Sequence, residues 1–243
     1  MRQLSVTKIA SLLTSGFPDF DAEIKDMTKQ LKAMGGKELT KEYQDLSKKI
    51  KEAEKGAINL KSSQQRGTAF HKIVELLEKG RIKLGEINEQ KILELSEQFE
   101  EIKGGIGTKR VGKKGTYTDE EKDLKDLTKL IKNYDKFKRE NKLSGTVTTE
   151  KSLGMITKIG DEYVEVVGTL DSLFNELGTL IDFKTSAMVD PKKIGIQLNL
   201  LKKMLKVGGV NVKSMKAFHL PFSKMSEGGV YDVREVSDEI IFD

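Results

Sequence analysis

The chain has 243 residues, 37% of them hydrophobic and 33% charged, which is the profile of a polar globular protein with a substantial core and, we expect, a single domain. It contains no cysteine, which excludes disulfide bridges, thiolate zinc sites and iron–sulfur clusters. A net charge of +5 permits a polyanionic partner without requiring one, and no apolar run approaches the roughly 20 residues of a membrane-spanning helix.

The first 61 residues predict three helices. A short helix over 4–13 should dock on the main body through Ile9, Leu12 and Leu13. The opening residues lack the apolar core of a signal peptide, so we expect a cytoplasmic protein, in the host cytoplasm if a phage encodes it. Over 21–61, sparse apolar residues at helical spacing, interrupted by Gly35 and Gly36, predict a hairpin of two helices, which we interpret as a solvated insertion without chemistry.

A further helix is predicted to begin at Thr68, a suitable N-cap residue. Its buried stripe follows helical spacing through Phe70, Ile73, Val74 and Leu77. His71 flanks this stripe in the first turn. Two interpretations stay open: a packed or solvated histidine, or a metal ligand whose partners come from elsewhere in the chain.

Residues 86–103 predict another helix, followed by a segment rich in glycine and lysine over 104–115. From Gly107 to Lys113 this segment superficially matches a phosphate-binding P-loop. We reject that interpretation because Lys114 stands where Ser or Thr should hold the metal and because no buried strand precedes the segment. We expect a mobile basic loop that could touch a nucleic-acid backbone, and then a long helix over 118–142.

A β region opens at 146–156 and leads into an antiparallel hairpin. Two runs rich in β-branched and apolar residues, 164–174 and 179–185, flank a four-residue loop that ends in Gly178. With that loop, Phe174 faces Thr179 and Asp171 comes out directly opposite Asp182.

One face of this hairpin carries charge. Lys184 shares the side of Asp182, whereas Ile181 and Phe183 point the other way. Two neighbouring carboxylates repel each other unless a cation lies between them, and hard oxygen ligands suit Mg²⁺ or Mn²⁺. The alternative is an Asp–Lys ladder on a solvated face.

After the hairpin, Asp190 as N-cap and Pro191 as first residue predict a helix that runs to about Lys206. Its Gln197 is surrounded by apolar residues, so its amide needs a hydrogen-bond partner, either a backbone group or the site itself. Two more strands are predicted at 210–220 and 230–233. His219 lies at the end of the first, and we assign it no function.

Four short motifs occur in a fixed order along the chain. They are Gly67-Thr68-Ala69-Phe70-His71, Gly168-Thr169-Leu170-Asp171, Ile181-Asp182-Phe183-Lys184-Thr185 and Gln197-Leu198-Asn199-Leu200. In this order, and with an opening Leu4-Ser5-Val6-Thr7-Lys8-Ile9, the chain resembles the RecB-like nucleases of the PD-(D/E)XK superfamily, in particular small stand-alone members from phages and mobile elements. The helices at about 21–61 and 86–143 are elaborations of that pattern.

The resemblance implies an α/β fold in which a central mixed sheet is flanked by helices. It also implies a metal-dependent phosphodiesterase site, with His71, Asp171, Asp182 and the backbone carbonyl of Phe183 as ligands of Mg²⁺ or Mn²⁺. Lys184 would position the attacking water or steady the charge of the transition state.

By the same resemblance Gln197 matches the glutamine of the following helix, although Leu201 stands where the family commonly has tyrosine. The expected function is that of a DNA nuclease, in the first place an exonuclease. It would act on single- or double-stranded DNA with little sequence specificity, in recombination, repair or phage DNA processing. A recombination or replication protein would be its partner. The alternative is an inactive module that keeps the nuclease fold and binds DNA or protein.

Overall fold

A mixed β-sheet forms the centre of the protein. The computed structural model describes residues 2–12, 14, 20–35, 40–159, 161–186, 189–222 and 228–235. Within these ranges the sheet runs in the order β1-β5-β6-β7-β8, and β4 pairs with β5. Its strands are β1 (Arg2–Ser5), β4 (Val147–Ile159), β5 (Glu162–Phe174), β6 (Thr179–Lys184), β7 (Ser214–His219) and β8 (Gly229–Asp232).

Strand β5 organises the sheet because three other strands pair with it. β1 lies parallel to β5, whereas β4 and β6 lie antiparallel to it. Beyond β6 the sheet continues with β7, which is parallel, and β8, which is antiparallel to β7. The expected central mixed sheet is therefore confirmed.

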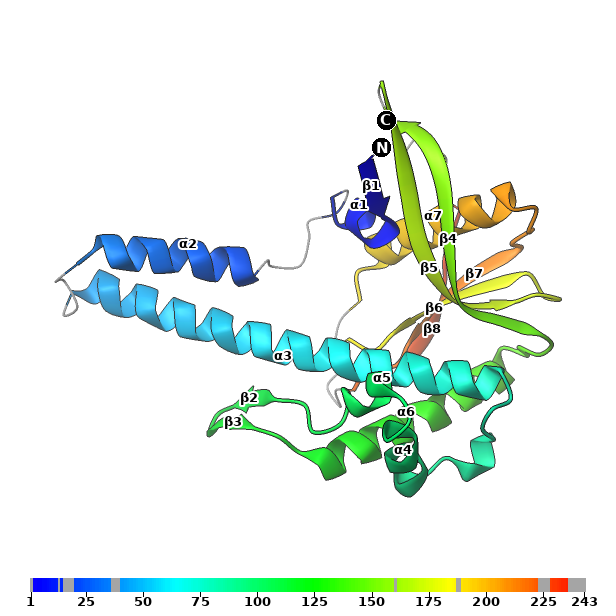
Figure 1. Cartoon of the computed structure of the whole chain (residues 1–243), viewed down its shortest axis with the longest axis horizontal. Helices are drawn as coiled ribbons and strands as arrows, with labels where there is room; N and C mark the ends of the chain where they lie inside the picture. The colour runs from blue at the N-terminus through cyan, green and yellow to red at the C-terminus, as the bar shows by residue number, and fades with distance from the viewer. Residues whose placement is uncertain are drawn as a thin grey trace.

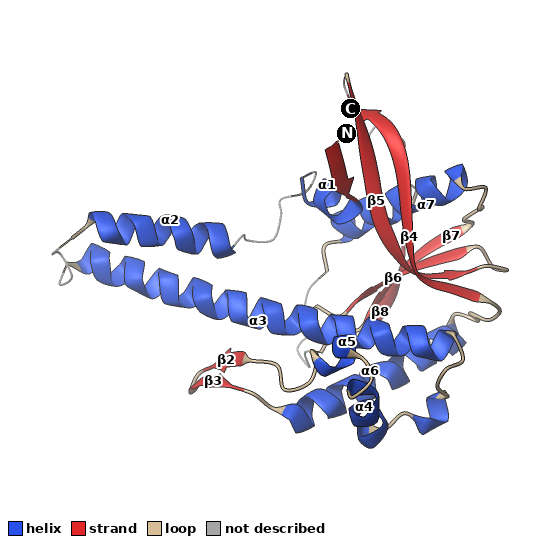
Figure 2. Cartoon of the chain, viewed as in Figure 1, coloured by secondary structure: helices blue, strands red, loops and turns tan. Residues whose placement is uncertain are grey.

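Helices cover both faces of this sheet, as Figure 2 shows. One buried cluster joins Leu180 and Ala217 of the sheet to α1 (Val6–Leu12) and α7 (Pro191–Val207). The other joins Ile181, Phe183 and Phe218 to the helices of the opposite layer. That layer consists of α3 (Lys41–Glu78), α4 (Glu89–Ser96), α5 (Glu100–Lys103) and α6 (Glu120–Glu140). Successive residues of β6 thus divide between the two layers, as the alternation of a strand requires.

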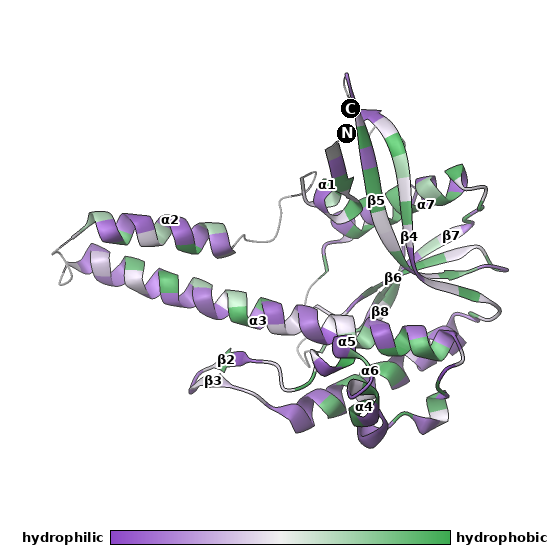
Figure 3. Cartoon of the chain, in the orientation of Figure 1, coloured by the Kyte–Doolittle hydropathy of each residue, from purple (hydrophilic) through white to green (hydrophobic). Residues whose placement is uncertain are grey.

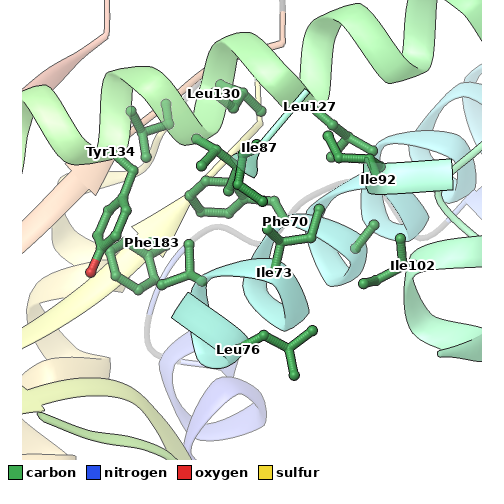
Figure 4. Packing of buried hydrophobic residues seen from close by; sticks show 14 of the residues in the cluster. Phe70, Ile73, Leu76, Ile87, Ile92, Ile102, Leu127, Leu130, Tyr134 and Phe183 are labelled. Atoms are coloured by element: carbon green, nitrogen blue, oxygen red, sulfur yellow. The ribbon is translucent and has the colours of Figure 1, made fainter. Parts of the chain in front are cut away.

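A cluster of aromatic side chains packs α3 against β6. The centroid of the Phe183 ring lies 5.8 Å from the ring centroid of Phe70 on α3 and 5.4 Å from that of Tyr134 on α6. Both pairs are edge-to-face. Figure 4 looks into this cluster between α3 and α6. Edge-to-face aromatic pairs contribute about 0.5–1.5 kcal/mol each beyond their burial, so this group fixes the position of α3 relative to the hairpin.

The prediction that a new helix begins at Thr68 was wrong, because α3 is one continuous helix of 38 residues. The Thr68 hydroxyl donates to the carbonyl of Gln64 inside the helix instead of capping it. The N-terminal half of α3 and α2 (Phe20–Ala33) form the predicted helical hairpin, which extends away from the sheet in Figure 1 and is largely hydrophilic in Figure 3. Residues 36–39 between them lie outside the described ranges.

Three other expectations need correction. Residues 2–5 form β1, so α1 starts at Val6 and not at Leu4, and Leu13 lies outside the described residues. The segment 86–103 holds two short helices, α4 and α5, after the 3₁₀ turn η1 (Leu84–Glu86). The segment expected to be a mobile loop contains β2 (Arg110–Gly112) and the first residue of β3 (Gly115–Tyr117), and these two strands pair antiparallel.

Contacts with α3 and α6 explain why this basic segment is ordered. The side chain of Asn59 on α3 bonds both the N–H and the carbonyl of Val111. Asp123 on α6, which is fully buried, accepts hydrogen bonds from the backbone and hydroxyl of Thr108 and forms an ion pair with Arg110.

The remaining elements follow the predictions. α6 covers most of the expected long helix, the loop at 175–178 joins β5 to β6, and Asp190 accepts hydrogen bonds from the N–H groups of Lys192 and Lys193 at the start of α7. In the part of the chain that is described, no helix combines the length and apolar character that crossing a membrane requires.

Candidate metal centre

His71 enters the site from α3. Its neighbour Phe70 is fully buried, and the His71 ring packs edge-to-face on Phe183 with 5.8 Å between ring centroids. The imidazole Nδ1 then lies 3.5 Å from Glu150 Oε1 and 3.5 Å from Asp171 Oδ1. Packing of the helix against β6 therefore delivers one nitrogen donor to two carboxylates from other elements.

Glu150 is the site residue that the sequence analysis missed. The ladder pairs Thr149 with Ser172 and Lys151 with Leu170, which leaves Glu150 opposite Asp171. Its backbone has φ of 48°, the left-handed region that side-chain-bearing residues rarely adopt. The pattern of β4 showed a strand here, but only its register against β5 reveals that this glutamate meets Asp171.

At Glu150 both strands of this ladder change the face that they bury. Residues an even number apart on a regular strand share a face. Met155 and Val166 nevertheless lie in the cluster with α7, whereas Val147 and Phe174 lie in the cluster with α3. The irregular backbone at Glu150 thus marks the point where β4 and β5 cross from one layer to the other, and the carboxylates lie at that crossing.

Asp171 is held by the neighbouring strand. The β5–β6 ladder runs from Phe174↔Thr179 to Ser172↔Ile181 and ends one residue short of Asp171 and Asp182. Asp171 Oδ2 instead accepts a hydrogen bond of 2.7 Å from the backbone N–H of Phe183, which leaves Oδ1 directed at His71. One oxygen is therefore used for positioning and the other faces the candidate ligands.

Asp182, which is buried, and Lys184, which is half-buried, form an ion pair beside this group. Lys184 Nζ lies 2.8 Å from each oxygen of Asp182 and donates its hydrogen bond to Oδ1. Burial raises the pKa of Asp182, and the charge of Asp171 adds to this, against the opposing effect of Lys184. Burial lowers the pKa of Lys184, but the charges of Asp182 and Asp171 outweigh it and the pKa is raised.

The charge at the centre fits a bound cation. Burial lowers the pKa of His71, but Asp171 and Glu150 outweigh this and raise it to about 9. The metal-free protein therefore holds a proton on His71 at neutral pH, between two carboxylates. A divalent ion bound here would displace that proton, as metal binding to imidazole requires.

Donor atoms of His71, Glu150 and Asp171 all lie within 4.8 Å of one another. Carboxylate oxygens suit Mg²⁺ and Mn²⁺, and an imidazole extends the choice to softer ions. The described residues thus bring together two of the three predicted metal-binding side chains, His71 and Asp171, and add Glu150. Asp182 lies outside this group and is held by Lys184, and Phe183 contributes its backbone N–H to Asp171.

Two hollows adjoin the charged residues. One, of about 490 Å³, lies between α3 and α7 and is lined in part by His71, Phe183 and Lys184. The other, of about 440 Å³, is lined in part by Asp171, Asp182 and Lys184. Thr7 and Gln197 line both hollows, and the Gln197 side chain donates from Nε2 to Thr7 Oγ1 at 3.1 Å. Gln197 therefore lies beside the site. Its Nε2 has a side-chain partner, whereas its buried Oε1 has no hydrogen-bond partner among the described residues.

The second histidine lies elsewhere. His219 is buried at the end of β7, and its Nε2 lies 2.8 Å from the carbonyl oxygen of Ser186. It thereby ties the segment after β6 to β7, and among the described residues it belongs to no group of metal-binding side chains.

No protein-family profile matches the sequence, and comparison with curated proteins finds no similar chain. Among solved structures, the chain is similar to one named "Putative exonuclease" from Eubacterium rectale, with 12% identity and a TM-score of 0.40, covering 67% of this chain and 64% of that one. It is also similar to the structure of a protein named SSO0001, with 16% identity and a TM-score of 0.32, covering 50% of this chain and 60% of that one. The chain therefore spans less than two thirds of either structure.

Proposed function

We propose that this protein is a divalent-metal-dependent nuclease that hydrolyses phosphodiester bonds of DNA, and that it acts as an exonuclease. The observation that carries the proposal is the convergence of His71, Glu150 and Asp171 beside the Asp182–Lys184 pair, which two hollows adjoin. A half-buried cluster of several acids, a histidine and a lysine with shifted pKa values beside a hollow is typical of an active site.

Each side chain has a part in this chemistry. His71, Glu150 and Asp171 would hold Mg²⁺ or Mn²⁺, with Asp182 and the Phe183 carbonyl as further ligands. Such an ion supplies a Lewis acid for a phosphate oxygen and activates a bound water. Lys184 keeps Asp182 oriented and places a positive charge where the phosphate gains negative charge.

The substrate would be bound mainly through its phosphates. Lys and Arg give the chain a net charge of +5, and contacts to phosphate carry affinity without sequence information. We therefore propose little sequence specificity, and the RecB-like branch of the PD-(D/E)XK superfamily as the family. The nuclease would act in recombination, repair or phage DNA processing. Its protein partner would be a recombination or replication protein.

End-labelled linear DNA and circular DNA, each incubated with the purified protein in Mg²⁺, Mn²⁺ or EDTA, test the proposal. Linear DNA should be degraded in either metal and remain intact in EDTA, and circular DNA should resist an exonuclease. Asp182→Ala or Lys184→Ala should lower the rate at least about 100-fold while unfolding remains cooperative.

Asp161→Ala and Lys158→Ala provide matched controls. Both residues are exposed at the far end of the β4–β5 hairpin, so their replacement should leave the rate unchanged. Full activity in the Asp182 or Lys184 variant, or cleavage that persists in EDTA, would contradict the proposal. DNA binding without any cleavage would instead identify the inactive module.

A further inference from the structure

The start of α1 is pressed against α7 next to the candidate metal centre. β1 pairs with β5 up to Ser5↔Val167, so Val6 and Thr7 follow directly over Gly168. A Cβ at Gly168 would lie 2.8 Å from Val6 Cγ2 and 3.0 Å from Leu201 Cδ2. Only a glycine lets α1 and α7 approach this closely, and the approach brings Thr7 to Gln197 across the two helices.

The Thr7 hydroxyl differs in its hydrogen bonding from the hydroxyls of Thr14 and Thr68. Thr14 and Thr68 each donate to the carbonyl oxygen four residues earlier. Residue 3 lies in β1, so no helical carbonyl is available to Thr7. Its oxygen accepts from Gln197 Nε2, and within the described residues this is the one hydrogen bond that it makes.

This contact determines whether the Thr7 hydroxyl acts as a hydrogen-bond donor or acceptor toward the hollows. A hydroxyl that accepts a hydrogen bond keeps one O–H to donate. Thr7 is exposed and lines both hollows together with Lys184, whereas Gln197 is buried beneath it. The amide therefore turns the Thr7 hydroxyl into a donor that faces the same space as the Lys184 ammonium.

We propose that Thr7 binds the substrate by donating its hydroxyl hydrogen to a phosphate oxygen of DNA, and that Gln197 is the positioning residue that orients this hydroxyl. The inference rests on the proposed function and deepens it, because it makes the N-terminal helix part of the binding site. Threonine hydroxyls are ordinary donors to phosphate, and a donor in a chain of hydrogen bonds is strengthened by the bond that it accepts.

The contact involves a phosphate that is charged before and after cleavage, so its loss should weaken binding more than chemistry. Thr7→Val removes the hydroxyl and keeps the shape, and it should raise KM about tenfold with kcat changed less than about threefold. Thr7→Ser should restore the KM of the unmodified protein. Affinity for a labelled oligonucleotide in EDTA should fall by the same factor, without any metal.

Gln197→Glu tests the direction of the hydrogen bond. A carboxylate can only accept, so it would take the Thr7 hydrogen and remove the donor from the hollows. This variant should raise KM as much as Thr7→Val does, and the double variant should be no worse than either single one. Thermal unfolding of each variant checks that the fold is kept.

The outcomes separate this inference from the proposed function. If the unmodified protein cleaves DNA and Thr7→Val has the same KM, or if Thr7→Ser is as impaired as Thr7→Val, only the role of Thr7 falls. Additive losses in the double variant overturn the coupling to Gln197. If the unmodified protein neither cleaves nor binds DNA, the proposed function itself fails.

Discussion

The backbone of Glu150 is strained at the position where its side chain reaches the candidate metal centre. A left-handed conformation at a non-glycine residue costs about 1–3 kcal/mol, and glycine would adopt it freely. Glu150 nevertheless occupies the position, with its carboxylate 3.5 Å from His71 Nδ1. The contact with His71 is the interaction that this conformation makes possible.

Glu150→Gln tests whether this carboxylate is a metal ligand. The change keeps the size of the side chain and removes its charge, so Mn²⁺ affinity measured by titration calorimetry should fall at least about tenfold. Stabilisation of the fold by Mn²⁺ against heat should shrink with it, since that stabilisation follows from binding to the folded state.

Glu162→Gln is the matched control, because Glu162 is exposed at the other end of β5. Equal Mn²⁺ affinity in Glu150→Gln and the unmodified protein would remove Glu150 from the proposed ligand set and leave the other proposed ligands in place.

At the scale of elements, glycines set how closely the layers approach. Gly168→Ala on β5 should lower the free energy of unfolding by about 1–3 kcal/mol, because the added methyl overlaps Val6 and Leu201 and must push α1 or α7 outward. Gly154→Ala on the paired strand β4 meets nothing closer than 3.9 Å and should be neutral or slightly stabilising. Urea unfolding of both variants measures the difference, and equal effects would show that the contact at Gly168 carries no packing cost.

Elements could be predicted where their signals are local. The loop at 175–178 fixes the register of β5 against β6, so the sequence alone placed Asp171 and Asp182 at the end of one ladder. The sequence did not reveal Glu150 as a site residue, because its position opposite Asp171 depends on the register in which β4 pairs with β5. The break assumed before Thr68 does not exist, since Gly67 and Thr68 both fit inside α3; a Cβ at Gly67 would lie 2.8 Å from Thr185 Oγ1, which shows how closely the helix passes the strand end.

At the scale of the whole molecule, α3 joins two regions of different packing. Between Ala69 and Leu76 it buries five residues (Ala69, Phe70, Ile73, Val74 and Leu76), whereas over 41–61 the one buried residue is Ala53. The hydrogen bond between the buried hydroxyls of Ser62 and Thr108 marks the boundary. On the outer side of this bond the helix packs on α2 and bonds Val111 of β2 through Asn59, so its outer half lacks the support of the central sheet.

This difference predicts that one continuous helix opens in two steps. Local opening requires less free energy where few apolar contacts must be broken, so backbone amides in 41–56 should exchange with solvent deuterium at least about tenfold faster than those in 69–77. Mass spectrometry of peptides from the two halves measures both rates in a single sample, and the shared helical backbone makes each half the control of the other. Because His71 lies in the inner half, Mn²⁺ should slow exchange there and leave the outer half unchanged. Uniform exchange along α3 would mean that the helical hairpin of α2 and the outer half of α3 opens together with the part of α3 that packs on the sheet. The hairpin would then not be an independently opening unit.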